Sequence, residues 1–179
     1  MELNQDNIQK IVAQVLAEMN EKKQAPAAPA QNFVIPKKAR VAMLTALRKI
    51  EIKEFDIPEI GDDEMLVKVE GCGICGTDVH EYKNDPFGLI PVVLGHEGSG
   101  QIVKMGKNIT MDTTGKPLAV GDRIVTCTIP CGHCDACLNM RDRDNLCEHS
   151  GIYGLMPADD HYHFNGWFSD YLVIRPGST

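Results

Sequence analysis

Long apolar runs are missing from this 179-residue sequence. No stretch approaches the roughly 18 consecutive apolar residues that a membrane-spanning helix requires. No charged-then-apolar leader with a small-residue cleavage site opens the chain either. We therefore expect a protein that is not secreted and has no membrane partner.

Positive charge is also in short supply. The chain carries 18 Lys and Arg against 25 Asp and Glu, which gives a net charge of −7. Nucleic-acid-binding proteins usually concentrate basic side chains on one face, so we expect no nucleic-acid partner. With 43% hydrophobic residues, the chain can bury the core of one ordinary domain.

The chain also lacks the even number of cysteines that is typical of a disulfide framework. The seven cysteines are odd in number, and four of them recur at short, metal-like spacings. Free and metal-binding thiols persist in reducing compartments, so we expect a cytoplasmic location.

The chain is predicted to have three parts. Residues 1–20 form an amphipathic helix, because apolar residues recur at helical spacing (Ile8, Ile11, Val12, Val15, Leu16 and Met19). Residues 21–36 form an Ala/Pro-rich linker, since proline lacks the amide proton that a helix needs. Residues 37–179 form a mostly β domain, with β-branched runs at residues 64–70, 100–105, 123–128 and 169–174.

Four cysteines follow the pattern Cys131-x2-Cys134-x2-Cys137-x9-Cys147. Zinc takes four thiolates tetrahedrally and leaves no open position, so this pattern predicts a structural zinc site. Disulfides, buried small side chains and an iron–sulfur cluster are the alternatives; the cluster is disfavoured because its commonest spacing differs and places a proline after the last cysteine. Cys127 is predicted to lie in a strand and to pack in the core.

The segment from Gly71 to Gly76 matches the dinucleotide fingerprint G-x-G-x-x-G, and Glu97 follows about 20 residues later. The fingerprint requires a crossover helix that leads to a parallel strand. Only a short stretch separates Gly76 from the turn-forming residues 84–88, so we reject this interpretation.

A second group of polar residues favours a catalytic metal site. Cys75 and His96 supply a thiolate and an imidazole, the ligand types of a catalytic zinc with an open position. Asp78 or Glu97 could orient these ligands from behind. The alternatives are that Cys75 and His96 are core residues, or that Cys72 and Cys75 form a redox pair.

These residues resemble the zinc-dependent, medium-chain alcohol dehydrogenases. The pattern Gly95-His96-Glu97-x2-Gly100-x5-Gly106-x2-Ile109 matches that family's zinc signature, and residues 73–78 match the segment with its first zinc ligand. The segments 121–123 and 166–171 extend the resemblance in the right order, over roughly residues 38–179.

The resemblance implies a GroES-like, partly open β-barrel with a zinc-binding lobe. It implies that Cys75 and His96 bind the catalytic zinc, that Thr77 takes the proton of an alcohol, and that His80 passes it towards solvent. The alcohol would become an aldehyde or ketone by hydride transfer to NAD(P). A full-length enzyme would be a homo-oligomer.

Two departures from the family pattern modify these expectations. The fourth structural cysteine usually follows after a shorter gap than the nine residues found here. The family's third catalytic ligand and its Rossmann domain would lie beyond Thr179, so we expect this chain to lack an NAD(P) site and to be inactive alone. We expect a filled structural zinc site and a weak catalytic one, where Glu97 or water completes the ligands. The alternative function is a zinc-stabilised, non-catalytic binding or cargo module.

The N-terminal helix and linker precede the resemblance to dehydrogenases. They resemble the encapsulation peptides that direct enzymes into bacterial microcompartments by docking an apolar stripe on a shell protein. This implies a shell-protein partner for residues 1–20 and a microcompartment lumen as a possible location. A helix docked on the protein's own surface and an oligomerisation helix are the alternatives.

Overall fold

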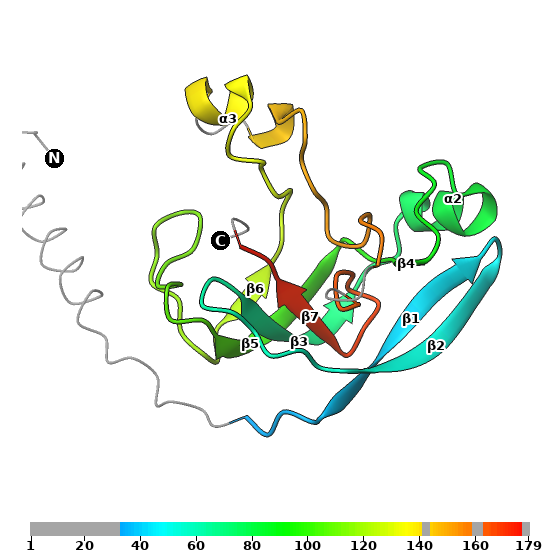
Figure 1. Ribbon diagram of the computed structural model, residues 1–179, viewed down its shortest axis with the longest axis horizontal. Helices are drawn as coiled ribbons and strands as arrows, with labels where there is room; N and C mark the ends of the chain where they lie inside the picture. The colour runs from blue at the N-terminus through cyan, green and yellow to red at the C-terminus, as the bar shows by residue number, and fades with distance from the viewer. Residues whose placement is uncertain (1–32, 141–143, 159–162, 177–179) are drawn as a thin grey trace, which may run out of the picture. The chain divides into compact units, whose positions relative to one another are not determined.

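The computed structural model describes residues 33–140, 144–158 and 163–176 (Figure 1). The chain divides into two compact units, Met1–Ala30 and Gln31–Thr179, and all described residues belong to the second. The predicted helix at residues 1–20 and most of the predicted linker lie outside the described residues. No helix within the described residues is long and apolar enough to cross a membrane.

Two antiparallel sheets form the body of the described unit. The first has the strand order β2-β1-β4, from Lys49–Asp56, Lys38–Ala46 and Val92–Val93. The second has the order β6-β5-β3-β7, from Arg123–Val125, Gly98–Met105, Met65–Cys72 and Tyr171–Ile174. Neither sheet closes on itself, so the predicted mostly β, partly open architecture is confirmed.

The core forms because strand side chains alternate between the two faces of each sheet. Val41 and Met43 on β1 are buried, as are Leu66 and Val67 on β3 and Ile102 on β5. Ser169 bridges to Val41 across the two sheets, and the buried Trp167 lies close by in sequence. Cys75 comes three residues after the end of β3, and His96 comes three residues after the end of β4, so the polar residues of the predicted catalytic site lie just beyond these two strands.

Three short helices complete the described unit. Gly76–Asn84 forms α2, Asp135–Asn139 forms α3, and Asp144–Leu146 forms the 3₁₀ helix η1. In Figure 1, α2 lies near the tip of the β1–β2 hairpin, and α3 lies on an extension away from the four-stranded sheet.

The structure corrects the prediction for residues 123–128. The strand ends at Val125, so Cys127 lies beyond it and is exposed rather than packed in the core. It also adds α2, which the sequence reasoning did not place. Among the described residues β3 pairs with β5 and β7, both antiparallel, whereas the dinucleotide fingerprint requires a following parallel strand.

Candidate functional site: two clusters of metal ligands

The first cluster begins where β3 gives way to α2. Cys75 is the N-cap of α2, and Asp78 lies in the first turn of the helix. The backbone N–H of Cys75 donates a hydrogen bond of 2.8 Å to Oδ2 of Asp78. A carboxylate here satisfies a free amide and interacts favourably with the helix dipole, which explains why the chain turns into a helix at this point.

Asp78 also holds the segment that carries His96. Its Oδ1 atom accepts a hydrogen bond of 3.2 Å from the N–H of Gly95, and the same oxygen lies 3.8 Å from Nδ1 of His96. The Asp78 side chain is only 4% exposed. One buried carboxylate therefore connects the two segments that supply Cys75 and His96, an arrangement suited to orienting metal ligands.

Three of the predicted metal ligands lie together. One ligand atom from each of Cys75, His96 and Glu97 lies within 4.8 Å of the others. Nδ1 of His96 is buried without a hydrogen-bond partner, and Glu97 is exposed. A thiolate, an imidazole and a carboxylate are the donor types of catalytic zinc sites, so this cluster fits a zinc ion with room for water or substrate.

The two predicted proton-transfer residues lie on α2 beside this cluster. The Sγ atom of Cys75 is 3.7 Å from Oγ1 of Thr77. His80 is exposed and follows Thr77 by three residues, a spacing that brings side chains together on one face of a helix. A hydroxyl next to the ligands and an exposed imidazole one turn away are suitably placed to move a proton between the site and solvent.

Cys72 lies outside the ligand cluster. Its thiol donates to the carbonyl oxygen of Gly73 at 3.2 Å, and burial raises its pKa. All seven cysteines are free thiols in this structure. The proposed redox pair of Cys72 and Cys75 thus has no bond to support it, whereas Cys75 has a metal-binding neighbourhood.

An apolar cleft adjoins Asp78, and the sequence reasoning missed it. It has a volume of about 220 Å³, and its lining residues besides Asp78 are apolar or aromatic (Ile50, Ile74, Val79, Tyr82, Leu94 and Phe168). These residues come from four separate segments, which is why no local pattern indicated the cleft. Ile74 and Val79 flank the metal motif itself, and their exposure was the available signal.

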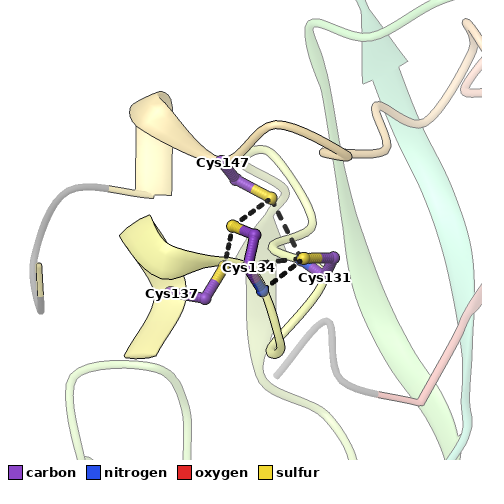
Figure 2. A group of neighbouring side chains, drawn as sticks. All are labelled: Cys131, Cys134, Cys137 and Cys147. Carbon is purple, nitrogen blue, oxygen red and sulfur yellow. Dashed lines mark hydrogen bonds between the residues drawn. The ribbon is translucent and has the colours of Figure 1, made fainter. Parts of the chain in front are cut away.

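The second cluster is the four-cysteine lobe shown in Figure 2. Its sulfur atoms converge: Sγ of Cys134 lies 3.5 Å from that of Cys137 and 3.9 Å from that of Cys147, and the sulfurs of Cys131 and Cys137 are 3.9 Å apart. Tetrahedral zinc with Zn–S bonds of about 2.3 Å separates its sulfurs by about 3.8 Å. The observed distances therefore fit a structural zinc ion.

Backbone amides also point at these sulfurs. The N–H groups of Cys131 and Cys134 donate to Sγ of Cys147 and Cys131, both at 3.3 Å. Hydrogen bonds from the backbone N–H groups of Cys137 and Glu148 lower the pKa of Cys134 to about 6. Such donors favour the thiolate form, which is the form that binds a metal.

The lobe has almost no other means of holding itself together. Its buried residues are Cys134, Ala136 and Cys147, with Cys131 and Cys137 packed against them. His133 is exposed, and its Nδ1 atom lies 2.8 Å from the carbonyl oxygen of Cys131. Among the described residues of this segment, Ala136 is the only other apolar residue of its core, so the segment depends on its metal for stability.

Comparison with known proteins identifies the family. Residues 61–178 match the family described as alcohol dehydrogenase GroES-like domain. The chain belongs to the zinc-type, medium-chain alcohol dehydrogenase family, and the predicted GroES-like fold is confirmed.

Individual relatives are polyol and alcohol dehydrogenases. The chain is 34% identical to sorbitol dehydrogenase of Bacillus subtilis over 146 residues, which cover 79% of this chain and 37% of that protein. It is 40% identical to L-galactonate-5-dehydrogenase of Escherichia coli over 123 residues, which cover 68% of this chain and 32% of that protein. The chain therefore spans about a third of the length of these relatives.

Solved structures agree with this assignment. An alcohol dehydrogenase from Thermotoga maritima superposes with a TM-score of 0.70 at 33% identity, covering 78% of this chain and 39% of that one. A protein from Sinorhizobium meliloti, described as a zinc-binding dehydrogenase and solved with NADP, gives a TM-score of 0.60 at 33% identity and covers 78% of this chain and 36% of that one.

Proposed function

We propose that residues 37–179 are the catalytic domain of a zinc-dependent alcohol dehydrogenase, which converts an alcohol to an aldehyde or ketone by hydride transfer to NAD(P). The observation that carries this proposal is the convergence of Cys75, His96 and Glu97 within 4.8 Å, with Asp78 bound to both segments. Membership of the family supports it.

In this proposal the residues of α2 handle the proton. A zinc ion held by Cys75 and His96 would supply Lewis-acid polarisation of the substrate oxygen. Thr77 accepts the proton of the substrate hydroxyl, and the exposed imidazole of His80 passes it to solvent. Asp78 keeps the imidazole of His96 in position, and Glu97 completes the ligand set when no other protein ligand is present.

The two sites should differ in metal affinity. The four-cysteine lobe offers four thiolates within its own segment, whereas the first cluster offers one thiolate, one imidazole and one exposed carboxylate. Thiolate-rich closed sites bind zinc most tightly. We expect one firmly bound zinc ion in this chain, and a second one that a chelator removes readily.

Two cysteines of one motif provide a matched test of the catalytic proposal. The measurement is alcohol-dependent reduction of NAD(P) by the product of the complete natural gene, in which Cys75 or Cys72 is changed to serine. Cys75→Ser should abolish activity and the weaker metal site, whereas Cys72→Ser should keep both. Full activity in Cys75→Ser would refute the assigned ligand. Activity of the 179-residue chain alone would refute the expected dependence on a nucleotide-binding part.

We further propose that residues 1–20 direct the protein to a bacterial microcompartment by binding a shell protein, so that the protein resides in the lumen rather than free in the cytoplasm. The amphipathic spacing and the Ala/Pro-rich linker of residues 21–36 support this proposal. Fusing residues 1–20 to a fluorescent protein, with Leu16→Glu as the control, tests it in cells that assemble microcompartments. Diffuse fluorescence from both fusions would contradict the proposal. It would favour a helix that docks on the protein's own surface or an oligomerisation helix.

A further inference from the structure

The strand β2 forms the open edge of its sheet. Within residues 33–140, 144–158 and 163–176 it pairs only with β1, in the order β2-β1-β4. It is eight residues long, whereas edge strands that avoid pairing are usually short, bulged or interrupted by proline. The register with β1 is regular from Lys38 to Leu44, so the facing part of β2 is regular too.

The hydrogen-bond pattern shows which groups of β2 face outward. The N–H of Ile57 donates to the carbonyl of Lys37. In the register of this ladder, the N–H and C=O groups of odd-numbered residues of β2 therefore bond to β1. On the other side of β1, the N–H of Ala42 donates to the carbonyl oxygen of Phe168, so the backbone N–H and C=O groups of even-numbered residues of β1 point away from β2. Because inward and outward groups alternate along a strand, the N–H and C=O groups of Ile50, Ile52 and Glu54 point to the open edge.

We propose that this edge is a homodimer interface, in which β2 pairs antiparallel with β2 of a second copy about a two-fold axis at Ile52. The three-stranded sheet of one copy then continues into the three-stranded sheet of the other. Each outward N–H and C=O group from Ile50 to Glu54 gains a partner. An isologous contact of this kind closes after two chains and does not propagate.

Charge and the length of the ladder together select this register among those that the hydrogen bonds allow. With Ile52 on the axis, Glu51 lies opposite Lys53 of the second copy, and Lys53 lies opposite the second Glu51. A shift that puts Glu51 on the axis pairs Glu51 with itself and Lys49 with Lys53. A shift that puts Lys53 on the axis pairs two lysines. A shift that puts Ile50 on the axis pairs Lys49 with Glu51, but the new ladder then contains only residues 49–51 of β2, because the strand begins at Lys49. Like charges directly opposite destabilise a strand pair and opposite charges stabilise it.

The side chains of this edge favour burial as well. Ile50 is 46% exposed and Ile52 is 68% exposed, and both lie on the face of the hairpin shared with Leu44. In the proposed register Ile52 faces its own copy, and each Ile50 is diagonal to the opposite Ile52. Four isoleucines thus cover one another on a face where they are now in water.

Two charge variants test the interface and its register together. The proposed dimer contains the pair of position 51 with position 53 twice. In Lys53→Glu both of these pairs join two glutamates, and in Glu51→Lys both join two lysines. Each variant alone should raise the dissociation constant of the dimer at least about tenfold. Mixing the two variants should restore a dimer, because every cross-strand pair then joins a lysine to a glutamate. A folding defect in either variant could not be repaired by mixing.

The measurement is sedimentation equilibrium of the 179-residue chain, whose monomer mass is 19.7 kDa. We expect the unchanged chain and the mixture to approach twice this mass, and Ile52→Asp to stay monomeric. Val125→Asp is the matched control, since Val125 is 74% exposed on β6, the edge of the other sheet. A monomeric unchanged chain, a dimer that Ile52→Asp leaves intact, or a mixture that stays monomeric would each overturn the proposal.

Discussion

The four-cysteine lobe provides the sharpest prediction, the effect of Cys147→Ser. Cys147 supplies one of four converging sulfurs, and nine residues separate it from Cys137, the nearest of the other three along the chain. Its loss should therefore release the return loop as well as one ligand. The matched control is Cys127→Ser, because Cys127 is an exposed free thiol outside the cluster.

The size of the effect follows from the composition of the lobe. Structural zinc in small peptides contributes about 10–16 kcal/mol of apparent binding free energy, so one of four ligands accounts for roughly 3–4 kcal/mol. That corresponds to a zinc affinity about 100- to 1,000-fold weaker. Ala136 is the only non-cysteine residue in the core of the lobe as far as residues 131–140 and 144–147 are described, so little apolar burial there holds the segment without its metal.

Two measurements check this reasoning. Competition with a chromophoric chelator gives the zinc affinity, and hydrogen exchange reports the local order of the lobe against that of β3. We expect Cys147→Ser to lose zinc and protection in the lobe while β3 keeps its protection. Unchanged zinc affinity, or equal losses in the Cys127→Ser control, would refute the assigned metal site. Simultaneous loss of protection in β3 would refute the independence of the lobe.

Three further predictions concern the barrel and α2. Asp78→Asn should weaken metal binding at the first cluster about 10- to 100-fold, as a cobalt titration would measure, because it removes the charge behind His96. Gly98→Ala places a Cβ 2.1 Å from the ring of Trp167 and should lower the free energy of unfolding in urea by about 1–3 kcal/mol, whereas Gly71→Ala, with nothing within 4 Å, should not. Glu81 is fully buried, and burial raises the pKa of its carboxyl group. The protonated carboxyl therefore contributes to stability at low pH, and this contribution is lost as the pH rises through the pKa of the folded state. Glu81→Gln should therefore stabilise the protein more at pH 8 than at about pH 4, by urea unfolding at each pH.

The sequence located β3, β5 and β7, but it named no run at β1 or β2 and missed the helix α2. The runs that became β3, β5 and β7 contain β-branched residues and bury many of their side chains, and such runs are typical of strands. The helix α2 has no such pattern, because its two buried residues are Asp78 and Glu81. Because the buried face of this helix carries carboxylates, the segment shows no hydrophobic periodicity and resembles a polar turn in the sequence.

Cys127 was misplaced for a related reason. Its β-branched neighbours continue the run that begins at Arg123, but the ladder with β5 stops at Val125. The N–H group of the Trp167 indole then donates to Oγ1 of Thr126 at 2.9 Å. A tertiary hydrogen bond therefore shapes the chain at this point, and no local propensity records such a contact.

The two metal sites differ in what the sequence could show, and the difference is physical. The four cysteines lie in one short segment that folds around its own metal, so spacing alone carried the prediction. Cys75 follows β3 and His96 follows β4, and these two strands belong to different sheets. Hydrogen bonds between the two segments bring them together: Asp78 accepts from the N–H groups of Cys75 and Gly95, and the N–H of Gly73 donates to the carbonyl of Glu97. A site built in this way exists only once the barrel has formed. Its metal affinity should accordingly fall with any mutation that loosens the barrel, whereas the affinity of the lobe should respond only to its own ligands.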